Sequence, residues 1–364
     1  MMEKQELQDN AIAEDSEDLN ADTEVVAVVG AGAWGTVLSW LLAEQGYRVN
    51  LWCYEPDLVM AIRNSRENLG YLPGVLLPRN VLATSSMEIA LEDANAIVFA
   101  VPSHAARSVL TQMLEFLTEP LPILSVSKGI ETDTLMLMTE IIMDVLPASM
   151  HDHIAVLSGP SFAQEVRRRQ PTHVVLASDH PDMAAEWQKK LMTHFFRPVL
   201  STDVLGVQLG GAVKNIISLG TGMLDGLELG ENTKAAFLTH GMDEIIRLGE
   251  AMGADPKTFT GLAGLGDLIL TGTGSISRNR DIGVRLSRGR SLEKLMEERM
   301  SVAEGVNTAK AVAELAKRHS VEMPIVAAMN TIMYEDADPR STLLSMLERL
   351  IPDHVETATA NHAS

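Results

Sequence analysis

The chain contains one cysteine, Cys53, among its 364 residues. A single thiol can form neither a disulfide framework nor a thiolate metal cluster, so we expect no metal site of that kind and a reducing, cytoplasmic location. Long apolar runs are also missing. No segment reaches the roughly 18 uninterrupted apolar residues that a membrane-spanning helix requires, and membrane insertion is therefore not expected.

Positive charge is scarce as well. The chain has 29 Lys and Arg residues against 49 Asp and Glu residues, which gives a formal net charge of -20. Nucleic acid and anionic membrane surfaces would be repelled over most of such a surface, so neither is expected as a partner. A small anionic substrate would need a local basic pocket.

The texture of the sequence changes partway along the chain. Residues 1–23 are acid-rich, lack the features of signal and transit peptides, and are predicted to be a disordered tail, as are residues 353–364. Residues 24–202 alternate helix-like stretches with seven short apolar, β-branched runs: EVVAVVG, RVNLWCY, AIVFAVP, PILSVSKG, HIAVLSGP, HVVLAS and RPVLST. This alternation predicts a parallel sheet covered on both faces. Residues 203–352 instead carry long amphipathic stretches and are expected to be helical.

A glycine motif follows the first predicted strand. Gly30, Gly32 and Gly35 form GAGAWG between the strand EVVAVV and the helical run TVLSWLLAEQG. Gly30 permits a tight turn, Gly32 lets the backbone approach a pyrophosphate, and Gly35 allows the helix to pack closely on the strand. This context predicts a Rossmann-type dinucleotide site, whereas a glycine-rich loop without a ligand is the alternative.

The choice between NAD and NADP depends on the end of the second strand. RVNLWCY is followed by Glu55, near the position where a Rossmann fold places the carboxylate that binds the ribose 2'-hydroxyl. Glu55 favours NAD, but Arg63 and Arg66 are candidates for a 2'-phosphate, so both cofactors stay open.

Two lysines and one aspartate are candidates for acid–base chemistry. Lys214 is the only charged residue in the apolar helical run VQLGGAVKNIISLGTG, where partial desolvation would lower its pKa; a lysine that snorkels to the surface is the alternative. Lys128 follows the strand PILSVS, at the sheet edge where ligands bind in open α/β folds, or it is a solvated turn lysine. Asp267 lies in GLAGLGDL and is either part of this site or a helix cap.

A phosphate receptor is predicted further along. Ser277, Arg278 and Asn279 open a helix, and an arginine beside helix-terminal N–H groups matches the geometry of phosphate oxygens. A charged loop without a ligand is the alternative.

Taken in order, the blocks GAGAWGT, SKGI, SGPSFAQEV, GVQLGGAVKNI, GENTKAAFLTHG, GLAGLGDL, SRN and AEGVNTA resemble the bacterial NAD(P)-dependent sn-glycerol-3-phosphate dehydrogenase family, over Glu24 to about Met323. The resemblance implies a Rossmann-type doubly wound sheet followed by an all-α domain similar to the C-terminal domain of 6-phosphogluconate dehydrogenase. It implies hydride transfer between NAD(P)H and dihydroxyacetone phosphate, giving sn-glycerol 3-phosphate for phospholipid synthesis. A homodimer is expected by the same analogy.

The resemblance also implies residue roles. Lys214 would be the proton acceptor, assisted by Lys128, Asp267 and Asn215. Substrate positions would be Lys128, Gly159, Ser161, Lys214, Asp267, Ser277, Arg278 and Asn279. Cofactor positions by resemblance would be Ala33, Trp34, Tyr54, Lys128, Ala163, Arg278, Val302 and Glu304, in addition to Gly30, Gly32, Gly35 and Glu55 of the dinucleotide site described above.

The chain departs from the family pattern at two positions. Tyr54 stands where the family often has Arg or His, which puts a preference for NADPH in doubt. Gly272 stands where the family usually has Cys, and we expect it to loosen a loop before the phosphate receptor with a modest effect on affinity.

Two other functions remain as alternatives. A hydroxy-acid dehydrogenase of the same architecture should carry a carboxylate receptor, and the SRN segment with two lysines speaks against it. A non-catalytic, redox-responsive dinucleotide-binding regulator would have no use for Lys128, Lys214 and Asp267.

Overall fold

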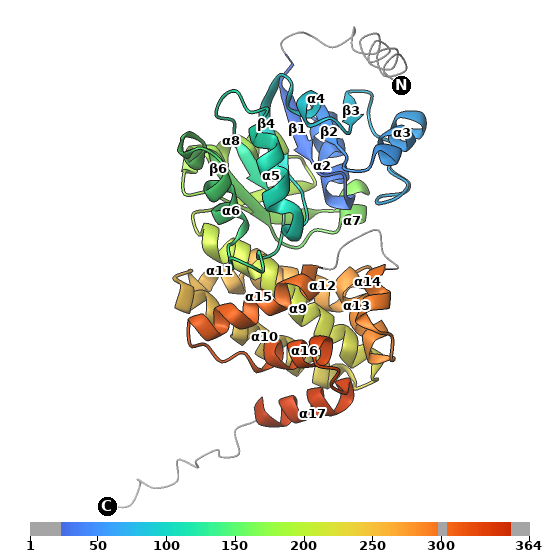
Figure 1. Ribbon diagram of the computed structural model, residues 1–364, viewed down its shortest axis with the longest axis vertical. Helices are drawn as coiled ribbons and strands as arrows, with labels where there is room; N and C mark the ends of the chain where they lie inside the picture. The colour runs from blue at the N-terminus through green and yellow to red at the C-terminus, as the bar shows by residue number, and fades with distance from the viewer. Residues whose placement is uncertain (1–22, 298–303, 351–364) are drawn as a thin grey trace, which may run out of the picture.

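The computed structural model describes residues 23–297 and 304–350. A layered sheet domain occupies one end of the molecule and a helical region the other, as Figure 1 shows. The predicted tails lie outside the described residues, apart from Thr23. No helix within the described ranges is both long and apolar enough to cross a membrane.

The sheet has eight strands in the order β3-β2-β1-β4-β5-β6-β7-β8. The strands are β1 (Val25–Val29), β2 (Arg48–Trp52), β3 (Val81–Thr84), β4 (Ala94–Phe99), β5 (Ile123–Ser125), β6 (Ile154–Ser158), β7 (Thr172–Ala177) and β8 (Phe196–Ser201). Neighbouring strands are parallel except for β6 and β7, which run antiparallel. The predicted sheet is confirmed with two differences: its last two strands are reversed, and β3 was not predicted.

Apolar side chains on both faces explain why β1 is buried along its whole length. Val26 and Val28 point into one core, with side chains of α2 and α8, while Ala27 and Val29 point into a second core with α4, α5 and α6. The helices of this domain are α2 (Ala33–Glu44), α3 (Pro56–Ser65), α4 (Met87–Leu91), α5 (Ala106–Leu114), α6 (Met138–Val145), α7 (Ala163–Arg167) and α8 (Pro181–Leu191). Helices on both faces make this a doubly wound fold.

The helical region confirms the predicted all-α half and is arranged around one long helix, α9 (Val204–Gly226). Its other helices are α10 (Glu231–Met252), α11 (Pro256–Thr260), α12 (Asp267–Thr273), α13 (Arg278–Ser287), α14 (Leu292–Glu297), α15 (Glu304–Arg318), α16 (Pro324–Tyr334) and α17 (Pro339–Leu350). Residues from Gly206 to Leu224 of α9 are buried without interruption, because α10, α12, α13 and α15 all pack on it. Figure 1 shows α9 running through the middle of this region.

The passage between the two regions is short. β8 ends at Ser201, and Asp203 caps α9 by accepting a hydrogen bond from the Gly206 N–H at 2.9 Å. The domain boundary predicted between residues 202 and 203 falls in this passage and stays a prediction.

Candidate active site

The glycine motif forms the turn between β1 and α2. Gly30 has φ +113°, and a Cβ there would lie 2.6 Å from the Ala100 carbonyl oxygen; a Cβ at Gly35 would lie 1.9 Å from the Gly30 carbonyl oxygen. A Cβ at Gly32 would meet nothing within 4 Å, which leaves the space above the turn open. Ala33 and Trp34 begin α2, whose N-terminus receives no side-chain cap. These features fit a dinucleotide pyrophosphate.

The end of β2 lies beside this turn, because the Gly30 N–H donates to the Trp52 carbonyl at 3.1 Å. Glu55 accepts a hydrogen bond from the Tyr71 hydroxyl at 2.9 Å, while the Tyr54 side chain is 77% exposed. Arg63 donates its Nε to the Ala83 carbonyl at 2.9 Å. Arg66 donates to the carbonyls of Pro78 and Val81.

Two lysines from different parts of the fold meet on one carboxylate. Lys128, which follows β5, donates from Nζ to Oδ2 of Asp267 at 2.6 Å. Lys214, in the middle of α9, donates from Nζ to Oδ1 of the same residue at 2.8 Å. The Lys214 and Asp267 side chains are only 7% and 2% exposed. Lys214 therefore does not snorkel to the surface, and the Asp267 carboxylate is engaged by ammonium groups rather than by its own helix end.

Burial and charge act in opposite directions within this cluster. The pKa of Lys214 is lowered to about 8, chiefly by burial, with the charges of Lys128 and Arg278 acting in the same direction and the attraction of Asp267 opposing them. Burial alone would raise the pKa of Asp267, but the charges and hydrogen bonds of Lys128 and Lys214 outweigh it, and that pKa is lowered. The result is an ionised carboxylate beside an amine whose proton is available near neutral pH.

Thr271, which no sequence motif indicated, also contacts Lys214. Its Oγ1 accepts a hydrogen bond from Lys214 Nζ at 2.6 Å and donates to the Asp267 backbone carbonyl, also at 2.6 Å. Thr271 follows Asp267 by four residues on α12, so both lie on one face of that helix. That spacing is the signal that would have pointed to it.

The substrate positions implied by the resemblance surround this cluster. The Gly159 carbonyl accepts hydrogen bonds from Lys128 Nζ at 3.2 Å and from the Ser161 hydroxyl at 3.0 Å. Ala163, assigned to the cofactor, begins α7 two residues further on.

The SRN segment stands at the N-terminus of α13, as predicted from the sequence. Ser277 caps the helix by accepting from the Arg280 N–H at 3.4 Å, and Arg278 and Asn279 follow in its first turn. The Asn279 amide donates to the Asn215 side-chain oxygen at 2.9 Å, which connects this turn to the residue after Lys214. The charge of Arg278 influences both Lys214 and Glu304, so this arginine lies within electrostatic reach of the cluster.

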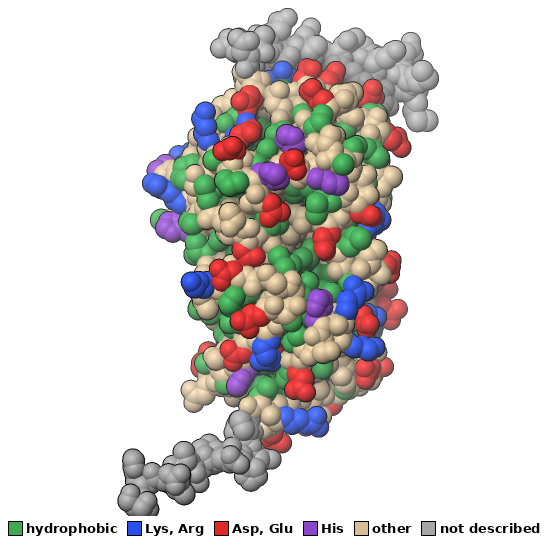
Figure 2. All heavy atoms as spheres, turned by 90° about the vertical axis from the view of Figure 1, so that its left-hand side faces the viewer, with side chains coloured by type: hydrophobic (Ala, Val, Ile, Leu, Met, Phe, Trp, Pro, Cys, Tyr) green, Lys and Arg blue, Asp and Glu red, His purple; other side chains and the backbone are tan. Residues whose placement is uncertain are grey.

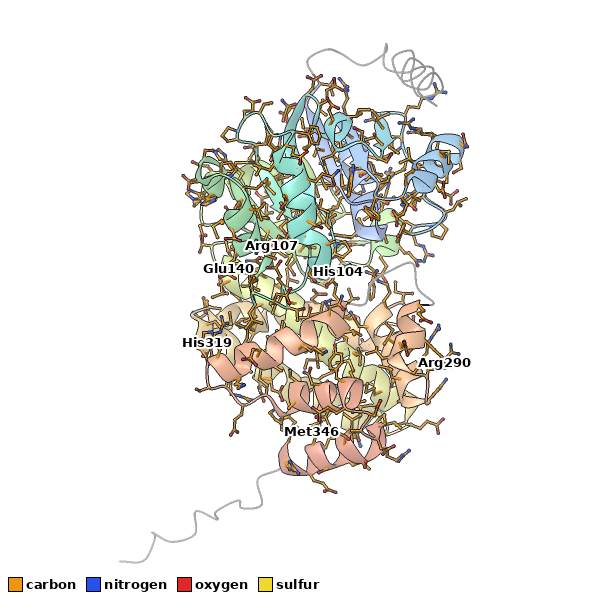
Figure 3. The ribbon with its side chains drawn as sticks, viewed as in Figure 1. His104, Arg107, Glu140, Arg290, His319 and Met346 are labelled. Carbon is orange, nitrogen blue, oxygen red and sulfur yellow. The ribbon has the colours of Figure 1, made fainter. Side chains whose placement is uncertain are left out.

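Glu304, at the start of α15, reaches back to the sheet domain. Its carboxylate accepts from the backbone N–H of Ser103 at 3.1 Å and from the Ser103 hydroxyl at 2.5 Å. Burial raises the pKa of the Glu304 carboxyl, while the Ser103 hydrogen bonds oppose the rise. Figure 3 labels His104, next to Ser103, at the end of α5 that faces the helical region. Val302, assigned to the same cofactor site, lies outside the described residues.

Gly272 departs from its predicted setting. It lies inside α12 and is buried, whereas we expected it in a loop before the phosphate receptor. The run LTGTGS contains two glycines, which is typical of a loop, but the packing of α12 on α9 and α10 keeps this stretch helical.

Among the residues that the structure describes, no group of three or more His, Cys, Asp or Glu side chains is placed to hold a metal ion. On the face drawn in Figure 2, acidic side chains are scattered among basic and apolar ones and no single basic patch dominates. The concentration of cationic groups is local: Lys128, Lys214 and Arg278 belong to the buried cluster and its rim.

Comparison with known proteins covers nearly the whole described chain. Residues 25–184 match the family described as NAD-dependent glycerol-3-phosphate dehydrogenase N-terminus, and residues 203–344 match its C-terminus. The chain is 45% identical over 326 residues to a glycerol-3-phosphate dehydrogenase [NAD(P)+] of Geobacter sp. (strain M21), covering 90% of this chain and 97% of that protein. It is 44% identical over 331 residues to the protein of the same name from Bacillus cereus (strain B4264), covering 91% and 97%.

A solved structure agrees in fold. The crystal structure of glycerol-3-phosphate dehydrogenase from Coxiella burnetii superposes with a TM-score of 0.86 at 36% identity, covering 90% of this chain and 99% of that one.

Proposed function

We propose, because the chain belongs to the NAD-dependent glycerol-3-phosphate dehydrogenase family, that it interconverts sn-glycerol 3-phosphate and dihydroxyacetone phosphate with an NAD(P) cofactor. The observation that carries this proposal is the pair of lysines that share the Asp267 carboxylate between the sheet domain and the helical region. Oxidation of a secondary alcohol needs a base for the hydroxyl proton and donors for the oxygen, and this cluster offers both.

Each residue of the cluster has a distinct role in the proposed reaction. A bound nicotinamide dinucleotide supplies the hydride acceptor for oxidation or the hydride donor for reduction. Lys214 in its neutral form takes the proton of the C2 hydroxyl, and its ammonium form returns that proton in the reverse direction. Lys128 donates a hydrogen bond to the same oxygen, while Asp267 and Thr271 hold the Lys214 amine in place. Asn215 ties this centre to the phosphate side through Asn279.

The substitution Lys214→Ala tests the proton-transfer role. We expect kcat to fall by about 100- to 10,000-fold, the usual contribution of a positioned acid or base, while cofactor binding is retained. The measurement is steady-state oxidation of NADH and of NADPH with dihydroxyacetone phosphate. Lys189→Ala on α8, an exposed lysine of the sheet domain, is the matched control and should keep full turnover. Near-normal turnover of Lys214→Ala would remove Lys214 from the chemistry.

The substitution Arg278→Ala tests the phosphate receptor. Arg278 opens α13, where the N-terminal backbone N–H groups and a guanidinium together suit a phosphate. We expect the Michaelis constant for dihydroxyacetone phosphate to rise by about 10-fold or more, as for the loss of a charged hydrogen bond. Arg290→Ala is the comparison, since that arginine lies beyond the end of α13, and Figure 3 labels it at the far edge of the helical region. An unchanged constant for Arg278→Ala would exclude this residue from the receptor.

The same proposal extends to the setting of the enzyme. Glycerol 3-phosphate is the backbone of glycerophospholipids, so the product would feed their synthesis. A cytoplasmic location and a homodimer complete the proposal; light scattering of the purified full chain tests the dimer.

A further inference from the structure

We propose that Tyr71 is a specificity-determining residue that holds the Glu55 carboxylate at the ribose position, so that the chain selects NAD(H) over NADP(H). The inference rests on the proposed function, because it concerns the cofactor of that same site. It assigns a role to the segment between α3 and β3, which no motif of the sequence analysis included.

The position of Glu55 supports the proposal first. Parallel pairing sets Trp52 opposite Val29, and the Gly30 N–H donates to the Trp52 carbonyl, so Glu55 follows β2 directly beside the glycine turn. A carboxylate at this place in a Rossmann fold binds the ribose 2'-hydroxyl. Glu55 is the N-cap residue of α3, yet its side chain makes no capping hydrogen bond there. The Glu55 carboxylate is therefore free of the helix end and can bind another group.

Tyr71 binds this carboxylate. Its hydroxyl donates to Glu55 Oε1 at 2.9 Å. Burial and the neighbouring Glu55 raise the pKa of Tyr71 to about 12, so the phenol remains a donor through the neutral range. Within the part of the chain that the structure describes, Oε2 of Glu55 makes no hydrogen bond. The arrangement fixes one carboxylate oxygen and leaves the other to accept from a hydroxyl.

The segment that carries Tyr71 is anchored to the pyrophosphate turn. Asn68 is completely buried, and its amide donates to the Ala31 carbonyl and to Thr36 Oγ1, both at 2.8 Å. The Tyr71 N–H donates to Asn68 Oδ1 at 3.1 Å. One short segment therefore holds both the glycine turn, through Asn68, and the ribose carboxylate, through Tyr71. These hydrogen bonds therefore hold the Glu55 carboxylate in a fixed position relative to the glycine turn.

The two arginines near Glu55 are already engaged by main-chain carbonyls. Arg63 binds the Ala83 carbonyl through Nε, and Arg66 binds those of Leu77, Pro78 and Val81. Turning either toward a 2'-phosphate would sacrifice these hydrogen bonds. A 2'-phosphate would also approach a carboxylate of like charge, and a like-charge contact weakens binding by about 10- to 1,000-fold.

The test measures cofactor binding without substrate, so it does not depend on turnover. The full chain is titrated with NADH and with NADPH, using the fluorescence of the bound reduced cofactor, and we expect the Kd for NADPH to exceed that for NADH at least about 10-fold. Tyr71→Phe should weaken NADH binding about 3- to 10-fold and leave NADPH binding nearly unchanged, because it releases Glu55. Glu55→Gln, which removes the charge, should tighten NADPH binding and bring the two constants together.

Tyr47→Phe is the matched control. Tyr47 precedes the N-terminal end of β2, whereas Glu55 follows its C-terminal end, and the Tyr47 hydroxyl makes no hydrogen bond within the described residues. Its ratio of Kd values should equal that of the unaltered chain. Equal or tighter binding of NADPH by the unaltered chain would overturn the inference, as would a Tyr71→Phe effect of the same size on both cofactors. Selective NADH binding without turnover of dihydroxyacetone phosphate would instead overturn the proposed function and leave this inference standing.

Discussion

At the scale of single residues, the site depends on one carboxylate that neutralises two ammonium groups. Asp267 is nearly inaccessible to solvent, and an isolated charge in such a place is strongly disfavoured. Two cations on one anion leave the cluster with a net positive charge, which suits an anionic substrate in a protein whose overall charge is -20. Burial is the main cause of the low pKa of Lys214, and the positive charge of Lys128 lowers it further.

This leads to a prediction for the pH dependence of the reaction. Lys214, with a pKa of about 8, must be neutral to accept a proton during oxidation of glycerol 3-phosphate. The kcat/KM for oxidation should therefore rise through about pH 8 and level off above it, while that for reduction should fall over the same range. Rates in both directions at pH 6.5 to 10, in one mixed buffer of constant ionic strength, provide the measurement.

The pH range and its control follow from the chemistry. Lys214→Arg keeps the positive charge but cannot lose its proton in this range, so its residual activity should show no such break. Profiles that are flat in both directions, or that slope in the same direction, would contradict the assignment of Lys214 as the titrating group.

At the scale of elements, α9 and α13 cross at backbone contact, and glycines make this possible. A Cβ at Gly222 would lie 1.9 Å from the Arg280 carbonyl oxygen, and a Cβ at Gly283 would lie 1.9 Å from that of Leu219. The Arg280 guanidinium also forms an ion pair with Asp225 of α9 at 2.6 Å. These contacts fix the N-terminus of α13, where Arg278 stands, relative to Lys214 on α9.

The substitution Gly222→Ala should therefore damage both stability and substrate binding. The methyl group has backbone in its way, so the helices must separate, at a cost of about 1–3 kcal/mol. The thermal midpoint should fall, and the Michaelis constant for dihydroxyacetone phosphate should rise as Arg278 moves.

Gly272→Ala is the matched comparison for that substitution. A Cβ at Gly272 would meet the end of the Leu238 side chain at 2.9 Å, which can rotate away, and alanine favours a helix over glycine by about 1 kcal/mol. That variant should be as stable as the unaltered chain or more so. Equal behaviour of the two alanine variants would refute the close-contact argument.

These elements also show how far the sequence could predict the structure. Apolar runs identified seven strands, but β3 was missed. Its sequence VLAT is only four residues long, although Pro78 and Asn80 before it and Ser85 and Ser86 after it are residue types that commonly bound a strand. The antiparallel direction of β7 could not be read either, because an apolar run has the same pattern in both directions.

The site was predictable only in part for a similar reason. Lys128, Lys214 and Asp267 were each recognisable from their surroundings and from the family resemblance. In sequence, however, Lys128 lies 139 residues and Lys214 lies 53 residues from Asp267. Only the fold shows that both lysines meet on the same carboxylate. Tyr71 and Asn68 lie in a loop without a motif, and their roles depend on tertiary hydrogen bonds.

At the scale of the whole molecule, polar side chains link the sheet domain to the helical region. The Lys128–Asp267 pair crosses between them, and Gln208 of α9 exchanges two hydrogen bonds with Thr139 of α6, at 3.0 and 2.9 Å. Glu304, an expected cofactor residue, forms a further link with Ser103. Cofactor and substrate would thus bind between two bodies that are already connected, and a loss of one link should affect binding as well as stability.

The substitution Glu304→Ala tests this connection. It leaves the Ser103 N–H and hydroxyl without their acceptor in a buried place, which costs about 1–3 kcal/mol. We expect a lower thermal midpoint by calorimetry, a broader or split transition as the two regions unfold less cooperatively, and weaker binding of reduced cofactor.

Two variants serve as controls for Glu304→Ala. Glu304→Gln should recover most of the stability and of the cofactor binding, because its carbonyl can accept from the Ser103 N–H and its amide can donate to the Ser103 oxygen. Glu314→Ala, an exposed position on the same helix, is the control and should leave both unchanged. If Glu304→Ala melted as sharply and bound cofactor as tightly as the unaltered chain, this contact would have no part in holding the two regions together.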